Sequence, residues 1–308
     1  MLQNFFKLFL FVSVSFASVQ GFSHPDTLEG LYEKQLKPAF EKIKPLQEYA
    51  KKRQTTYIIS AVLAIVVFAM FVKYFKLLGA LVAIVMIAGG IFYLKKTTSA
   101  ITPYKSIYNQ KILSPIGQFC CGYTYKDSAI GRSEVLQSNL FSAKFKNYDA
   151  QGLFIGKSVR FGYVDITFDT KENESVERFA ENTFSGFVVI LDRKNKTEGV
   201  MVSDAFKQKV ADLDPEFSAF FSKLPRSGKS NGFELFGEID QEKLDYCHTL
   251  ASREVAISFI HNKTYLFLVQ KNNPFAENVY ANFDLQHAQK YADAFKAIDV
   301  LIHTCDHE

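Results

Sequence analysis

The sequence predicts an α+β protein in which a two-helix transmembrane hairpin precedes a soluble domain with a mostly antiparallel sheet and a C-terminal helix. Two uncharged apolar runs early in the 308-residue chain predict the hairpin. Alternating runs rich in Phe, Val and Ile predict the strands, and an amphipathic stripe near the end predicts the last helix. Because the strands are grouped, with helices at the flanks, we expect α+β architecture and not alternating parallel βαβ units.

Residues 1–24 form an apolar leader for which three interpretations stay open. Lys7, the apolar run 8–16 and the small residues around Ala17 are typical of a secretory signal. The same stretch fits an additional membrane segment, or an extension upstream of the true start. A working signal would carry the basic segment that follows it across the membrane.

Residues 25–55 are predicted to form a juxtamembrane amphipathic helix. Apolar residues recur at helical spacing across 28–50, with Asp26 as the expected N-cap. Pro38 and Pro45 are expected to kink or interrupt this helix. Because its polar face mixes Glu with Lys, we expect the segment to pack on the C-terminal domain in preference to lying on a membrane surface.

The hairpin is assigned to residues 56–94. The runs YIISAVLAIVVFAMFV (57–72) and LLGALVAIVMIAGGIFYL (77–94) carry no charge, and only KYFK separates them. Each run is slightly shorter than the ~20 residues that a helix needs to cross a ~30 Å hydrocarbon core, and flanking Thr, Tyr and Phe residues extend it. Two uncharged runs this close together favour a membrane hairpin over a buried helical pair in a globular core.

The distribution of basic residues predicts the orientation of the hairpin. Lysines and arginines flank it on both sides, in 25–55 and in 95–111, and its tip carries only Lys73 and Lys76. Positive segments stay on the cytoplasmic side, so both flanks and the C-terminal domain are predicted to be cytoplasmic. The flanking basic residues expected to contact the headgroups of the lipid bilayer are Lys51, Lys52, Arg53, Lys95 and Lys96.

Residues 95–308 are predicted to form the soluble α+β domain. The run KSVRFGYVDITFD (157–169) alternates but changes parity around Tyr163, which predicts a bulge or twist near Gly162. FSGFVVILD (184–192) is typical of a buried strand, and 254–260 with 264–270 is typical of a hairpin.

Three helices are predicted in the second half of the domain. Two short ones fall at 204–210 and 215–224. The third is the clearest, because an apolar stripe runs from Leu285 to Ile302 and Asp284 precedes it as the expected cap.

Several segments, taken in order, resemble the landmarks of a known family. They are TLEGLYEKQLKPAFEKIKPLQ before the hairpin, KILSPIGQFCCGYTY after it, then SNLF, YDAQGLFIGK, FSGFVVILD and DLDPEFSAFF. With these landmarks the chain resembles, over about residues 27–305, a bacterial family of two-pass membrane proteins catalogued as a domain of unknown function and sometimes mislabelled galanin-like.

The resemblance carries its own expectations. It implies a multi-pass protein of the bacterial inner membrane whose domain faces the cytoplasm, with no established activity and no established catalytic residues. It also points to a small helical membrane protein of the LemA type as a partner. The leader lies outside the resemblance.

Charge and composition narrow the classes of function. The net charge is only +4 and the arginines are scattered singly, whereas nucleic-acid binders cluster basic residues on one surface. Nucleic acid is therefore not expected as a partner, and no cofactor is predicted. RSGKSNG (226–232) has Lys223 where a phosphate-binding loop needs glycine, so we interpret it as a solvated loop.

The four cysteines are Cys120, Cys121, Cys247 and Cys305. We expect buried or idle thiols in a reducing compartment, although a periplasmic domain with disulfides is the alternative if the leader is a working signal. Cys247 stands beside His248, but neighbours along a helix or strand point apart, so no catalytic residues are assigned.

The tail HTCDH (303–307) supplies the candidate metal ligands His303, Cys305 and His307, all of which suit zinc. Cys120 or Cys121 could complete such a site. A frayed polar tail is the plainer interpretation, because chain ends are the least ordered parts of a domain.

The sequence thus favours a membrane-anchored, non-enzymatic interaction or binding module at the cytoplasmic face of the inner membrane. The rival from another class is a thiol- or metal-dependent enzyme or sensor. That rival requires the cysteine pair, Cys247, His248 and the HTCDH tail to converge in the fold.

Overall fold

The computed structural model describes residues 26–98, 102–141, 145–168, 183–193, 197–213, 223–230, 232–239, 244, 250, 253–260, 262–276 and 278–305. The leader 1–24, the predicted helix 215–224 except its last residues, Cys247, His248 and His307 lie outside these ranges. Within them, nine antiparallel strands and a long C-terminal helix confirm the α+β class.

The sheet has the strand order β1-β2-β3-β4-β9-β8-β5-β7-β6. The strands are β1 (Thr124–Lys126), β2 (Phe145–Ile155), β3 (Val159–Phe168), β4 (Thr183–Asp192), β5 (Gly199–Ser203), β6 (Arg226–Ser230), β7 (Phe233–Gly237), β8 (Val255–Ile260) and β9 (Lys263–Val269). The predicted buried strand is β4, and the predicted hairpin is β8–β9, in which Ile260 pairs with Lys263.

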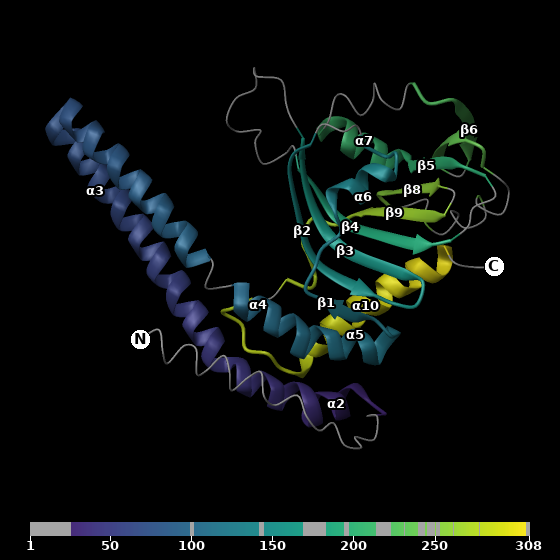
Figure 1. Cartoon of the computed structure of the whole chain (residues 1–308), viewed down its shortest axis with the longest axis horizontal. Coiled ribbons are helices and arrows are strands. Elements are labelled where there is room, and N and C mark those ends of the chain that lie inside the picture. Colours follow the sequence, from purple (N-terminus) through teal and green to yellow (C-terminus); the bar gives the residue numbers. More distant parts are fainter. Residues whose placement is uncertain are drawn as a thin grey trace.

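Helices cover both faces of the sheet (Figure 1). One face is covered by α2 (Leu28–Leu31), the first part of α3 (Lys37–Thr98), α4 (Thr102–Tyr108), α5 (Ser114–Cys121) and α10 (Leu285–Cys305). The other face is covered by α6 (Arg132–Gln137) and α7 (Asp204–Leu213). The last helix starts where the sequence predicts, because the Asp284 carboxylate accepts the backbone N–H of His287 at 2.9 Å.

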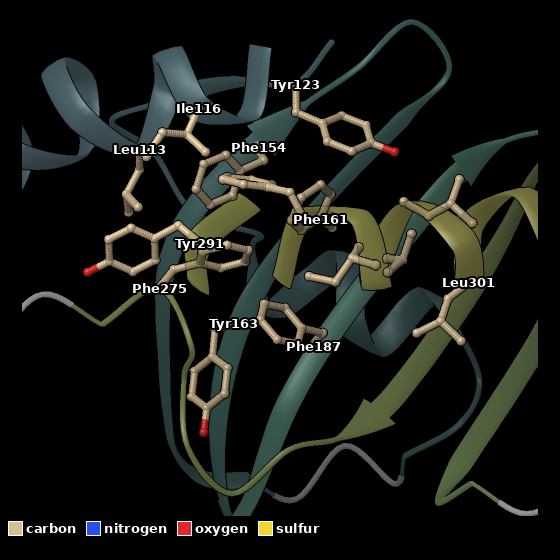
Figure 2. Close-up of a cluster of buried hydrophobic side chains, with 14 of the residues drawn as sticks. Leu113, Ile116, Tyr123, Phe154, Phe161, Tyr163, Phe187, Phe275, Tyr291 and Leu301 are labelled. Carbon is tan, nitrogen blue, oxygen red and sulfur yellow. The ribbon is translucent and has the colours of Figure 1, made fainter. Parts of the chain in front are cut away.

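The first core is built largely from aromatic rings between the sheet and α10 (Figure 2). Phe295 of α10 is fully buried and its ring centroid lies 4.4 Å from that of Phe275 and 5.0 Å from that of Phe154. Phe154 stacks on Phe161 of the neighbouring strand at 5.2 Å. Offset and edge-on ring pairs of this kind add to the free energy gained by burying the rings.

The irregularity predicted near Gly162 is present, but the bulge lies in the neighbouring strand. β3 pairs regularly with β4 from Val159 to Thr167, and the register shift opposite Gly162 lies in β2, between Gln151 and Phe154. The apolar positions of β3 change from odd to even residue numbers because both faces of the sheet are covered by a core. The first half of β3 sends Phe161 and Tyr163 into the α10-side core, and its second half sends alternate residues into the core on the other face.

The segment before the apolar runs packs on the domain, as the mixed charge of its polar face predicts. Leu36 is fully buried, and Phe40 lies 5.5 Å from Phe283 between ring centroids. Two local predictions are corrected. Thr27 is the N-cap in place of Asp26, since its hydroxyl accepts the N–H of Gly30 at 3.1 Å.

Pro38 does not interrupt the helix either, because a π-helical turn, η1 (Tyr32–Leu36), precedes it. The N–H of Lys37 bonds to the carbonyl of Tyr32, five residues back, so the ladder is re-phased before the proline, which has no N–H to donate. Helix α3 then continues through Pro45.

Helix α3 leaves the domain and doubles back toward α4 (Figure 1). Ala50 and Tyr104 are both buried in the same core cluster. A straight helix from Ala50 to Thr98 would be about 70 Å long, and the residues from Thr98 to Tyr104 span at most about 22 Å. The chain must therefore reverse its direction within the range of α3.

By length and composition, one helical stretch in the described part of the chain, Leu28–Met70, could cross a membrane, and none of its most apolar window is buried. Its exposed large apolar residues are Ile58, Ile59, Val62, Leu63, Ile65, Val66, Phe68 and Met70.

Candidate functional site

A small pocket with a volume of about 30 Å³, partly open to solvent, lies where three irregular segments meet. The π-helical turn η2 (Asn109–Leu113) contributes Asn109, the bulge of β2 contributes Gln151 and Gly152, and the loop after β9 contributes Asn273. Bulges and π turns are frequent next to functional sites because they re-aim side chains that regular elements would hold elsewhere.

The bulge depends on glycine. Gly152 has φ +68°, in the left-handed region that disfavours residues with a Cβ. Its carbonyl oxygen approaches Gly162 of β3 so closely that a Cβ there would overlap it. Glycine at both positions allows the bulge and this close approach, and the exposed Gln151 side chain lines the pocket.

Aromatic rings form the floor of the pocket, and polar groups line its wall. Phe154, Phe187 and Phe275 supply the rings, and Figure 2 shows the Tyr163 hydroxyl directed away from them. That hydroxyl donates to the carbonyls of Gln270 and Lys271, at 2.8 and 3.1 Å. Burial, reinforced by the charge of Asp165, raises the pKa of Tyr163, so it is neutral at physiological pH.

One polar atom of this wall is unsatisfied. The Asn109 Oδ1 atom is buried and has no hydrogen-bond partner in the described part of the chain. A buried carbonyl without a donor costs about 1–3 kcal/mol, so a donor group entering the pocket would be favoured. The described wall residues offer amide and phenol groups, which can form hydrogen bonds with a bound molecule.

The cysteine pair lies elsewhere, at the C-terminal end of α5 where it packs on α10. Cys120 and Cys121 are both free and half-buried. Burial raises the pKa of both thiols, and that of Cys121 rises to about 12, with the nearby Asp299 carboxylate as the second cause. Thiolates are the reactive form of cysteine, so neither thiol is activated at neutral pH.

The described part of the HTCDH tail continues α10 as far as Cys305. His303 is exposed, and its Nδ1 lies 2.9 Å from the backbone carbonyl of Asp299 and 3.5 Å from the Asp299 carboxylate. Among the described side chains, no group of three His, Cys, Asp or Glu residues is placed to hold a metal ion. The side chain of Cys305 and all of His307 fall outside that set, so the metal site stays a prediction.

The interpretation of RSGKSNG as a loop is wrong. Its first five residues form the edge strand β6, which pairs with β7. Lys229, the lysine of the Gly-Lys-Ser triplet, lies 3.0 Å from Asp204 and 3.8 Å from the nearly buried Glu234. Its charge is thus directed at carboxylates of the same chain, which agrees with rejecting a phosphate-binding loop.

The pocket itself was missed from the sequence. Asn109, Gln151 and Asn273 come from three distant segments, and none of them stands in a pattern that predicts contact. The only local signal is Gly152 within an alternating strand, since isolated strand glycines often mark bulges.

No protein-family model, curated protein or solved structure matches this chain significantly. The resemblance seen in the order of its sequence landmarks accordingly stays a prediction.

Proposed function

We propose that the chain is a membrane-anchored, non-enzymatic binding module, in which residues 56–94 form a two-span hairpin that holds the α+β domain at the membrane surface. The observation that carries this proposal is the run of eight exposed large apolar side chains between Ile58 and Met70. Soluble domains rarely expose an apolar patch of this size, and one on a projecting helix calls for a bilayer or another apolar partner.

The pattern of exposure supports a bilayer around a helical pair. The exposed residues cover most of the circumference of the helix, whereas Tyr57, Ala61 and Ala64 lie on one face and are half-buried. Small residues on that face allow a second helix to approach closely. The returning limb of α3 is the natural candidate, because the chain must come back to the domain at Tyr104.

The position of the domain follows from charge. Lys51 and Lys52 are exposed at the base of the projecting helix, and no Asp or Glu occurs between residues 49 and 126. Basic flanks of a span stay on the cytoplasmic side, so we place the domain at the cytoplasmic face of a bacterial inner membrane. A membrane protein of the LemA type, bound through the hairpin or the domain, is the partner that the resemblance proposes.

Topology reporters test this proposal. Green fluorescent protein and alkaline phosphatase are fused in turn at the C-terminus and between Lys73 and Lys76. We expect fluorescence from the C-terminal fusion and phosphatase activity from the tip fusion, because each reporter works on one side of the membrane only. Phosphatase activity at the C-terminus would contradict the cytoplasmic placement, and an inactive phosphatase at the tip would contradict the two-span hairpin.

A charge variant serves as the matched control. Replacing Lys51, Lys52, Arg53, Lys95 and Lys96 with Gln removes the basic residues nearest to the two apolar runs without shortening either run. We expect phosphatase signal to rise at the C-terminus beside the fluorescence, since the charge bias that favours one orientation is weakened. An unchanged orientation would assign that role to the more distant basic residues or to the leader.

A further inference from the structure

The loop that precedes α10 runs along the first part of α3 toward the apolar stretch (Figure 1). Three contacts fix its register. Phe283 packs on Phe40, Gln47 Nε2 donates to the carbonyl of Ala281 at 2.7 Å, and Lys51 Nζ lies 5.7 Å from the ring centroid of Tyr280. The loop and α3 run in opposite directions, because later loop residues contact earlier helix residues. Tyr280, which lies against Lys51, is therefore the contact nearest to the apolar stretch.

Tyr280 is held outward by a turn. Its N–H bonds to the Asn278 side-chain carbonyl at 2.9 Å, and the N–H of Ala281 bonds to the Asn278 backbone carbonyl at 3.1 Å. Val279 beside it is buried at 7% exposure, whereas Tyr280 is 42% exposed. A large aromatic side chain is therefore presented to the outside at the end of the loop.

Basic and aromatic residues of α3 lie close together in the helical turn next to Tyr280. Lys51 and Lys52 are exposed, and Arg53 Nε donates to the hydroxyl of Tyr49 at 3.1 Å. Lys51 precedes Ile58, the first exposed apolar residue, by about 10 Å of helix. The headgroup layer on each side of a bilayer is about 5–7 Å thick, so the backbone at Lys51 lies just outside it when Ile58 enters the core, and the long lysine side chains extend back to the headgroups.

We propose that Tyr280, together with Lys51, Lys52 and Arg53, forms a contact site for anionic phospholipid headgroups, so that the C-terminal domain itself docks on the membrane. The inference rests on the proposed membrane anchor. Tyr is favoured at the interface because its ring is apolar and its hydroxyl is polar. Lys and Arg near an anionic surface are each attracted to it, and the acids of this part of the loop, Glu277 and Asp284, flank residues 278–283 and do not interrupt them.

Docking of the loop would fix the orientation of the domain. A helical hairpin alone lets an attached domain pivot about the point where it emerges. A second contact from a loop far along the chain removes that freedom, and it holds the sheet and the Asn109 pocket in a constant position relative to the bilayer.

A single tryptophan tests the contact, because the chain contains none. Tyr280→Trp is prepared in the full-length chain and reconstituted in phosphatidylglycerol vesicles whose lipids are brominated at the headgroup end of the acyl chains. We expect its emission to be quenched and shifted to the blue. Val300→Trp is the matched control, since Val300 is 63% exposed near the C-terminal end of α10. That end of α10 lies away from α3 (Figure 1), so the emission should be unaffected.

The charge requirement is tested in the same vesicles. Replacing Lys51, Lys52 and Arg53 with Gln should lower the preference of the Tyr280→Trp loop for phosphatidylglycerol over phosphatidylcholine by roughly fivefold per charge. If the Tyr280→Trp protein with intact Lys51, Lys52 and Arg53 were quenched equally in both lipids, the contact would be purely aromatic, and the proposal of an anionic site would be overturned.

Carbonate extraction distinguishes failure of the membrane anchor from failure of the headgroup contact. If the protein resists extraction and Tyr280→Trp behaves like Val300→Trp, the headgroup contact is refuted and the anchor stands. If carbonate releases the protein, the anchor has failed and the headgroup contact fails with it.

Discussion

The surroundings of Cys120 and Cys121, where α5 packs on α10, determine how reactive the two thiols are. Burial disfavours their thiolates, and the acidic neighbour Asp299 adds to the effect at Cys121. Tyr123 donates to the same Asp299 carboxylate through its hydroxyl. The carboxylate is therefore engaged by a phenol, and its negative charge disfavours the thiolate of Cys121. A thiol enzyme would require the opposite arrangement, with a base beside an activated thiolate.

The alkylation rate of Cys121 tests this arrangement. In a variant with Cys120, Cys247 and Cys305 replaced by Ser, iodoacetamide should react slowly at neutral pH, and the rate should rise only toward a midpoint near the pKa of about 12. The denatured chain is the control and should show an ordinary midpoint of about 8.5. A folded-state midpoint at or below the denatured value would revive the thiol enzyme.

The same shift predicts how stability depends on pH. The folded-state pKa of Cys121 lies above the unfolded value, so the folded chain keeps its proton when the unfolded chain loses it. Below about pH 8.5 the thiol is protonated in both the folded and the unfolded chain, so it does not change the free energy of unfolding. The free energy of unfolding should fall as the pH rises from there toward 12, and Cys121→Ser should remove that part of the fall in the variant.

At the scale of elements, the strands and helices that could be predicted from the sequence are those whose own apolar residues recur with the period of a strand or a helix. β4, β8, β9 and α10 are of this kind. The sequence did not predict β6, because RSGKS has no apolar face and becomes a strand only by pairing with β7. The bulge was placed on β3 because the partner strand that bears it could not be identified from β3 alone. Pairing between distant segments, which also brings Asn109 and Gln151 together, leaves no local signal.

Gly186 shows how closely two central strands approach. It lies in β4 opposite Val269 of β9, and a Cβ at this position would overlap the carbonyl oxygen of Leu268. Backbone atoms in the middle of a sheet cannot yield as a side chain can. Gly186→Ala should therefore destabilise the fold by about 1–3 kcal/mol. This corresponds to a fall in melting temperature of roughly 2–4 °C per kcal/mol, measured by circular dichroism in detergent.

Gly89→Ala is the matched control for this substitution. Gly89 lies in α3, and a Cβ there meets no atom within 4 Å. Alanine is favoured over glycine inside a helix by about 0.5–1 kcal/mol, so this variant should be as stable as the parent or slightly more so. If both variants lost stability alike, the backbone contact at Gly186 would not be the cause.

At the scale of the whole molecule, the helical segment before the apolar stretch and the domain from Thr102 onward pack as one unit. The sequence divides them at residues 55 and 95, but Leu31, Leu36 and Phe40 share a core cluster with Tyr104, Ile112 and residues of α10. The apolar stretch beyond Ala50 projects from this unit, and the chain re-enters it at Tyr104. The apolar stretch beyond Ala50 is therefore flanked on both sides by residues of one shared core.

This arrangement predicts opposite outcomes for two deletions. Replacing residues 57–97 with a short Gly/Ser linker removes the apolar stretch and leaves both parts of the core, so we expect a soluble, folded domain with a cooperative thermal transition. Starting the chain at residue 102 removes Leu31, Leu36, Phe40, Ile43 and Ala50, each of which is at most 5% exposed. Burial of a large aliphatic or aromatic side chain contributes about 1.5–3 kcal/mol, and a small domain has only about 5–15 kcal/mol of net stability. The truncated chain should then aggregate or melt without cooperativity, as judged by gel filtration and circular dichroism. A truncated chain that folds as well as the linker variant would show that the N-terminal segment belongs to the anchor and not to the domain.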